Sequence, residues 1–165
     1  MDFNNNAIEE REFYFTKEGL MKAKKEYEDL KRIRLTKVKE DIPDVLESED
    51  LSPEYILFKQ DLDLIDQKIF ELENILKNAK IIKIPPKNKR DIVDIGATVY
   101  VEIEGIKDEF TIVGSFEANP SLGKISNESV VGRALLGHKV GDEIIISSPV
   151  KTRYKIKKIK YLSLS

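Results

Sequence analysis

The chain has 165 residues, and its 28 basic and 30 acidic side chains leave a formal net charge of −2. It has no cysteine, which excludes a disulfide scaffold, thiol catalysis and any zinc site that needs thiolates. A single histidine excludes a histidine-rich metal centre and argues against a Ser-His-Asp triad. No apolar run approaches the roughly 20 residues of a membrane span, and the acidic N-terminus lacks the features of a secretion signal. We therefore expect a cytoplasmic protein that does not contact membranes.

The first predicted element is a long helix that begins after Thr16, a residue suited to cap a helix N-terminus. Apolar residues recur at spacings of three and four from Leu20 to Leu30, and after a slip of one residue they resume at Leu35. Pro43 lacks a backbone N–H, so the helix should end or kink just before it.

A second helix is predicted to start at Ser52-Pro53, with serine as the cap and proline at the first helical position. Its apolar residues follow one unbroken heptad seam: Tyr55, Phe58, Leu62, Ile65, Ile69, Leu72, Leu76 and Ala79. Such a seam is typical of a coiled coil. Two helices of similar length with a short connection predict an antiparallel hairpin over residues 13–82.

Charge is distributed unevenly along this predicted hairpin. Residues 22–39 include eight basic and three acidic side chains, whereas residues 40–54 include seven acidic and no basic ones. The acidic tip, residues 43–52, should lie about 40 Å from the hairpin base, because an α-helix rises about 1.5 Å per residue. Like charges gathered there repel one another and add no stability, which favours a functional role.

The C-terminal half predicts a small β-rich domain over residues 91–165, preceded by a linker at residues 83–90 that contains two adjacent prolines. A short helix is expected over residues 130–136. Imperfect alternation between residues 154 and 159 predicts a β-bulge. The expected strands are Thr98–Ile103, Glu109–Val113, Glu143–Ile146 and Tyr154–Tyr161. The fold class is therefore α+β, a helical hairpin followed by a β-rich domain.

Five short motifs occur in a fixed order from Phe15 to near the C-terminus. They are Phe15-Thr16-Lys17-Glu18-Gly19-Leu20, Asp50-Leu51 with Glu54-Tyr55, Asn78-Ala79-Lys80-Ile81-Ile82, Val93-x-x-Gly96-Ala97-Thr98-Val99 and Ile125-Ser126-x-x-Ser129-x-x-Gly132-Arg133-Ala134-Leu135-Leu136-Gly137-x-x-x-Gly141-Asp142. In these motifs nearly the whole chain resembles the GreA/GreB family of bacterial transcript-cleavage factors. The resemblance implies an FKBP-like fold for the C-terminal domain.

The resemblance also implies a function. The hairpin would enter the secondary channel of bacterial RNA polymerase and bring its tip to the active centre, where the 3′ RNA of a backtracked complex is cleaved. Asp50 matches the family's tip aspartate and would ligate a Mg²⁺ ion shared with the polymerase, while Glu49 or Glu54 would position metal or water. Carboxylates suit this task, since Mg²⁺ prefers oxygen ligands and phosphodiester hydrolysis gains from two cations. The protein would be a monomeric accessory factor, with no catalysis and no bound cofactor of its own.

A basic face on the first helix fits the same expectation. Its residues lie between the tip and the base of the predicted hairpin: Lys31, Arg32, Arg34, Lys37 and Lys39. Their positive charge could attract the phosphates of nascent RNA in an elongation complex that also holds DNA. The alternative interpretation is an ordinary solvated helix surface.

The tip motif departs from the family pattern. Only Ser52-Pro53 separates Asp50-Leu51 from Glu54-Tyr55, where the family has four residues. Two hypotheses therefore stand beside each other: an active cleavage factor, and a Gre-like polymerase-channel binder that inhibits or regulates transcription without stimulating cleavage. A prolyl isomerase is suggested only by analogy of fold and is disfavoured by the few aromatic residues of the C-terminal half.

Overall fold

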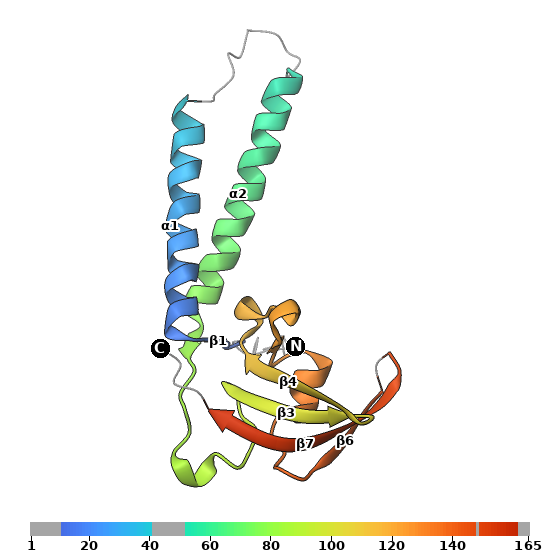
Figure 1. The fold of residues 1–165 in the computed structure, drawn as a ribbon. Helices are drawn as coiled ribbons and strands as arrows, with labels where there is room; N and C mark the ends of the chain where they lie inside the picture. The colour runs from blue at the N-terminus through green and yellow to red at the C-terminus, as the bar shows by residue number, and fades with distance from the viewer. Residues whose placement is uncertain (1–10, 41–51, 148, 162–165) are drawn as a thin grey trace, which may run out of the picture. The chain divides into compact units, whose positions relative to one another are not determined.

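The computed structural model describes residues 11–40, 52–147 and 149–161 (Figure 1). They form two compact units: a helical unit of residues 21–78, and a β-rich unit that combines residues 11–20 with residues 79–161. The α+β fold class, a helical hairpin followed by a β-rich domain, is confirmed. The domain borders at residues 82 and 91 stay a prediction, and the proposed linker contains a short 3₁₀-helix, η1 (Lys87–Lys89).

The hairpin consists of helices α1 (Lys17–Glu40) and α2 (Pro53–Lys77). Both predicted caps are present: the Thr16 hydroxyl accepts the N–H of Gly19 at 2.9 Å, and the Ser52 hydroxyl accepts the N–H of Tyr55 at 3.2 Å. These bonds satisfy backbone donors that the first turn of a helix leaves unpaired. Pro43 lies outside the described residues.

The heptad seam of α2 is confirmed, because its members are buried or half-buried while Leu57 and Leu64 beside it are 60% and 64% exposed. The predicted slip in α1 fails at Leu35, which is 56% exposed, whereas Val38, the next residue expected on that seam, is half-buried. The half-buried positions that continue the spacing of three and four beyond Leu30 are Arg34 and Lys37. An apolar pattern could not reveal a seam whose later members are charged.

A two-stranded parallel sheet that was not predicted joins β1 (Phe13–Phe15) to β2 (Ala79–Ile81). Three-residue strands are too short to show a period, and Ala79 was assigned to the second helix, which ends at Lys77. Phe15 is fully buried, and its ring centroid lies 5.5 Å from that of Phe116 in the 3₁₀-helix η2 (Ser115–Glu117).

The second sheet has five strands in the order β5-β4-β3-β7-β6. All four predicted strands are present, and β5, which pairs parallel to β4 after the 3₁₀-helix η3 (Pro120–Leu122), was missed. The turn between β3 and β4 is Glu104-Gly105, with φ of 49° and 86°, the left-handed pair that a tight two-residue hairpin needs. The bounds are β3 (Ala97–Ile103), β4 (Ile106–Val113), β5 (Lys124–Ser126), β6 (Glu143–Ser147) and β7 (Lys151–Tyr161).

One face of this sheet carries the hydrophobic core. Val99, Val101, Ile112 and Ile156 point to it and pack with Leu135 from helix α3 (Val130–Leu135). The predicted bulge in β7 is confirmed, because the pairing with β3 shifts by one residue between Tyr100 and Val101. Among the residues described, no helix is long and apolar enough to span a membrane.

Candidate functional site

The tip carboxylates are placed only in part by the structure. Asp50 and Glu49 lie outside the described residues, whereas Glu54 is exposed in the first turn of α2. A negative side chain is favourable at this position, because the free N–H groups of a helix N-terminus carry partial positive charge. Glu54 therefore has a local structural use besides the metal or water role predicted for it, and its catalytic role stays a prediction.

Two members of the predicted basic face are engaged in holding the hairpin together. The Arg34 guanidinium forms two hydrogen bonds with the Asp66 carboxylate, the longer being Nη2 to Oδ2 at 3.1 Å. The Lys37 ammonium lies 2.9 Å from Asp61 Oδ2. A step toward the C-terminus along α1 is matched by a step toward the N-terminus along α2, as the predicted antiparallel packing requires. Arg34 and Lys37 thus bridge the two helices.

The other members of the face lie differently. Arg32 pairs with Asp29 on its own helix at 2.5 Å, and Lys31 lies 3.4 Å from Glu28. Lys39 is exposed near the end of α1. Exposed pairs within one helix are weak and exchange readily for other partners, so Arg32 and Lys39 are the better candidates for RNA phosphates. That role stays a prediction.

A groove of about 550 Å³ lies between the helices beside these ion pairs. Its lining mixes apolar and charged side chains: Arg32, Ile33, Thr36, Lys37, Asp61, Leu64 and Ile65. Arg34 and Lys37 are long enough to span the distance between the two helices, whereas shorter apolar side chains could pack there only if the helices lay closer together. The ion pairs hold this half of the hairpin in register without a tight apolar core.

The cross-helix pair makes hairpin stability depend on pH. The hydrogen bonds from Arg34 lower the pKa of Asp66. A carboxyl group whose pKa is lowered by folding stabilises the fold above its unfolded-state pKa of about 3.9, and this contribution disappears as the pH falls through the lowered value.

We expect Asp66→Asn to lower the melting temperature of the hairpin slightly at pH 7, by no more than about 3 °C, since the pair is open to water. The difference from the unmodified chain should shrink as the pH falls below the unfolded-state value of about 3.9 and vanish once Asp66 is protonated in the folded chain. Circular dichroism melts at several pH values would measure it, with Asp63→Asn, an exposed neighbour on the same helix, as control. A deficit of equal size at every pH would contradict the assigned ion pair.

Glu117 is a positioning residue that the sequence did not reveal. Its carboxylate accepts the backbone N–H of Thr16 at 2.7 Å and the hydroxyl of Thr16 at 2.6 Å. A Cβ atom at Gly19 would lie 2.1 Å from Glu117 Cδ, so glycine leaves the room that this carboxylate occupies. The Thr-x-x-Gly motif is thereby explained. Thr16 caps α1 and hydrogen-bonds to Glu117, and Gly19 has no side chain that would collide with the Glu117 carboxylate.

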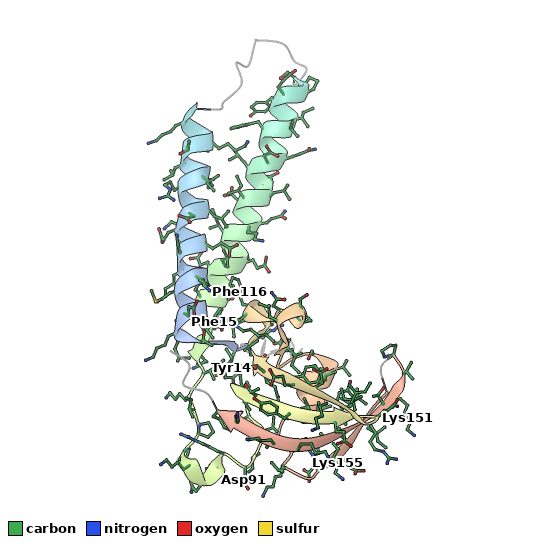
Figure 2. The ribbon with its side chains drawn as sticks, viewed as in Figure 1. Tyr14, Phe15, Asp91, Phe116, Lys151 and Lys155 are labelled. Carbon is green, nitrogen blue, oxygen red and sulfur yellow. The ribbon has the colours of Figure 1, made fainter. Side chains whose placement is uncertain are left out.

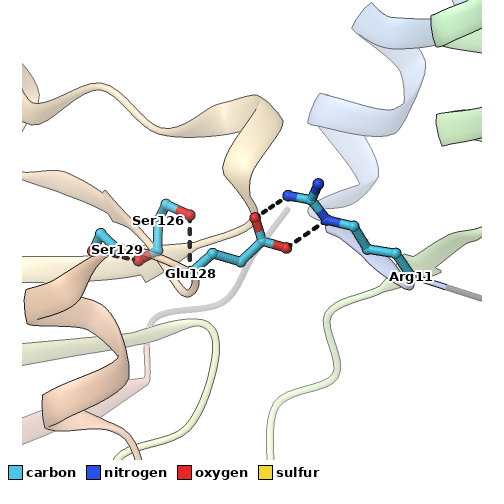
Figure 3. A network of polar contacts seen from close by, with 4 residues as sticks. All are labelled: Arg11, Ser126, Glu128 and Ser129. Carbon is cyan, nitrogen blue, oxygen red and sulfur yellow. Dashed lines mark hydrogen bonds and ion pairs between the residues drawn. The ribbon is translucent and has the colours of Figure 1, made fainter. Parts of the chain in front are cut away.

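The longest motif also has a structural explanation (Figure 3). Ser129 caps α3 by accepting the N–H of Gly132 at 3.0 Å and donates its hydroxyl to the carbonyl of Ser126 at 2.7 Å. A Cβ at Gly132 would lie 2.1 Å from that carbonyl oxygen. Glu128, which lies between these two serines in the sequence, accepts two hydrogen bonds from the Arg11 guanidinium, as Figure 3 shows. These residues fix the loop that leads into α3.

Metal ligation was predicted only for Asp50. In the described parts of the chain, no group of three or more histidine, aspartate or glutamate side chains could hold a metal ion.

Comparison with known proteins gives matches over both parts of the chain. The family model of the N-terminal part of the transcription elongation factors GreA/GreB matches residues 13–81, and the model of their C-terminal part matches residues 87–161. The transcription elongation factor GreA of Thermomicrobium roseum is 41% identical over 81% of this chain and 87% of its own length. The GreA of Clostridium acetobutylicum is 41% identical over 92% of this chain and 99% of its own length.

Solved structures give more distant matches. The GreA factor homolog 1 of Thermus thermophilus has 26% sequence identity and a TM-score of 0.40, and the match covers 91% of this chain and 99% of that one. A GreA/GreB elongation factor from Nitrosomonas europaea has 20% identity and a TM-score of 0.40, over 92% of this chain and 99% of the other.

Proposed function

The chain belongs to the GreA/GreB family of transcription elongation factors, and from this premise we propose that it binds RNA polymerase through the secondary channel and stimulates cleavage of the 3′ RNA in backtracked complexes. One observation carries the proposal: residues 40–54, with seven acidic side chains and no basic one, connect the two helices of a hairpin braced by cross-helix ion pairs. A long hairpin with acidic residues at its tip is suited to bringing carboxylates to a distant active centre. The protein would act as a monomer in the cytoplasm, beside nascent RNA and DNA.

The chemistry assigned to the tip follows from its charge. Asp50 would supply one oxygen ligand to a Mg²⁺ ion held by the polymerase, and Glu49 or Glu54 would orient that ion or the attacking water. Bound there, the ion stabilises charge on the attacking or leaving oxygen. The polymerase remains the enzyme in this proposal, and the hairpin adds ligands that it lacks.

The test is to add the purified protein to a stalled, backtracked elongation complex and to separate the RNA products. We expect short 3′ fragments to appear at a rate that rises with protein concentration. The alternative from the sequence, a channel binder without cleavage activity, predicts slower nucleotide addition and no fragments at any Mg²⁺ concentration. That second result would overturn the proposal and would identify the shortened tip as the mark of an inhibitor.

A further inference from the structure

The last strand, β7, carries a row of cations on the sheet face opposite the core. We call Lys151, Arg153, Lys155, Lys157, Lys158 and Lys160 the β7 basic strip; Figure 2 labels two of them, Lys151 and Lys155. The β-bulge in β7 explains why two consecutive lysines, Lys157 and Lys158, can lie on the same face of the sheet. Ile156 pairs with Val101 and Lys158 pairs with Tyr100, which leaves Lys157 as an extra residue. Two lysines therefore face outward side by side while the flanking isoleucines stay in the core.

Carboxylates on the same face neutralise only part of the strip. Glu143 is shared by Lys155 at 3.1 Å and Arg153 at 3.8 Å, and Glu102 takes Lys157 at 2.9 Å. Lys160 lies over the ring of Tyr100, with its nitrogen 5.3 Å from the centroid. In the described part of the chain, Lys151 and Lys158 have no ion-pair partner. The strip therefore carries an excess of positive charge.

The pKa of Glu102 reflects the positive charge of the strip. Its pKa is lowered by the hydrogen bond from Lys157 and by the nearby charges of Lys155 and Lys107. Next to it lies an open hollow of about 500 Å³, whose charged lining consists of three cations, Lys151, Arg153 and Lys155, and three carboxylates, Glu102, Glu104 and Glu143. The cations thus border a depression in the sheet surface that a ligand could enter.

We propose that the β7 basic strip binds the phosphate backbone of a nucleic acid without sequence preference. On an extended strand, residues two apart lie roughly 6.7 Å from each other, so the strip is a straight line of charge suited to a linear polyanion. A folded protein partner fits less well, because interface centres are depleted in lysine and need apolar anchors. Ile145 is 53% exposed on this surface, but the charged side chains of Glu143 and Arg153 flank it, so it does not form an apolar patch.

The strip shares no residue with the acidic tip or with the basic face of α1, and the proposal does not rest on RNA cleavage. The probe is a fluorescently labelled DNA duplex of about 20 base pairs, mixed with the full chain and followed by anisotropy over a series of salt concentrations. We expect micromolar binding at roughly 50 mM salt that weakens steeply as salt rises, because phosphate contacts release counterions.

The decisive variant replaces three strip cations that no carboxylate of the described residues pairs with: Lys151→Gln, Lys158→Gln and Lys160→Gln together. Affinity should fall at least about tenfold, and the slope of log K against log salt should lose roughly 2 to 3. The matched control, Lys83→Gln with Lys87→Gln and Lys89→Gln, changes the net charge equally at exposed positions outside the strip and should bind like the unmodified chain. Arginine at the same three strip positions should keep the affinity.

Three results would overturn the proposal: no binding at low salt, equal losses in the strip variant and its control, or displacement of the duplex by polyglutamate of the same charge at lower concentration. The last outcome would assign the strip to an acidic protein. Melting curves of both triple variants should match the unmodified chain, since these side chains point away from the core, so a loss of binding would not be a loss of folding.

Discussion

Replacing Gly114 by alanine should destabilise the β-rich unit by at least about 3 kcal/mol, an unusually large effect for one methyl group. The backbone of Gly114 has a φ of −67°, which any residue can adopt, so the penalty is purely steric. An added Cβ would lie 1.7 Å from the carbonyl oxygen of Tyr14 and 2.7 Å from its carbon. Both obstacles are backbone atoms, which cannot turn aside as a side chain can. Strand β1 would have to move, taking the buried Phe15 with it.

Thermal unfolding followed by circular dichroism would measure this loss. Gly105→Asn is the matched control: it lies in the turn between β3 and β4 with a φ of 86°, and no atom lies within 4 Å of its added Cβ. Asparagine tolerates the left-handed conformation, so the control should lose no more than about 1 kcal/mol. If Gly114→Ala melted together with the control, the close packing of β1 on this loop would be wrong.

Asp50→Asn should reduce stimulated RNA cleavage by an order of magnitude or more, which corresponds to a barrier raised by at least about 1.4 kcal/mol. The amide keeps the size of the carboxylate and removes the charge that would ligate Mg²⁺. Binding to the polymerase should hardly change, because the tip would act at the chemical step. A higher Mg²⁺ concentration should restore part of the rate if metal recruitment is what was lost.

The control for this prediction is Asp63→Asn, the same chemical change at an exposed position of α2 away from the tip. It should leave both binding and cleavage unaltered. Equal cleavage by the unmodified chain and by Asp50→Asn would show that the family's tip aspartate has no counterpart at residue 50. Glu47, Glu49 and Glu54 would then be the next residues to change.

Much of the fold could be predicted because long periodic patterns leave little choice. Seven seam positions from Tyr55 to Leu76 fix α2, and alternation fixes the long strands β3 and β7 together with the bulge. The prediction failed where contacts between distant parts of the chain determine the local structure. The short strands β1, β2 and β5 exist because other backbone segments complete their hydrogen bonds, and the α1 seam passes through Arg34 because Asp66 faces it across the hairpin.

The candidate site was predictable to a lesser degree. An acidic run marks the tip by charge alone, yet no periodicity tells which carboxylate acts, and Asp50 and Glu49 lie outside the described residues. The hairpin's basic residues were visible as charges, but their partners Asp66 and Asp61 lie far along the chain. Glu117 could not be found from the sequence, since its role depends on a contact with Thr16.

The parallel pairing of β1 with β2 makes the hairpin an insertion within the β-rich unit. The chain leaves this sheet after Phe15 and enters it again at Ala79, which pairs with Phe13 two residues before that exit. Both ends of the insertion are therefore fixed next to each other, whatever length of helix lies between them. Turns could be added to or removed from the two helices in matched numbers without rebuilding the β-rich unit. The reach of the hairpin is thus free to vary in evolution while the body that carries it stays the same.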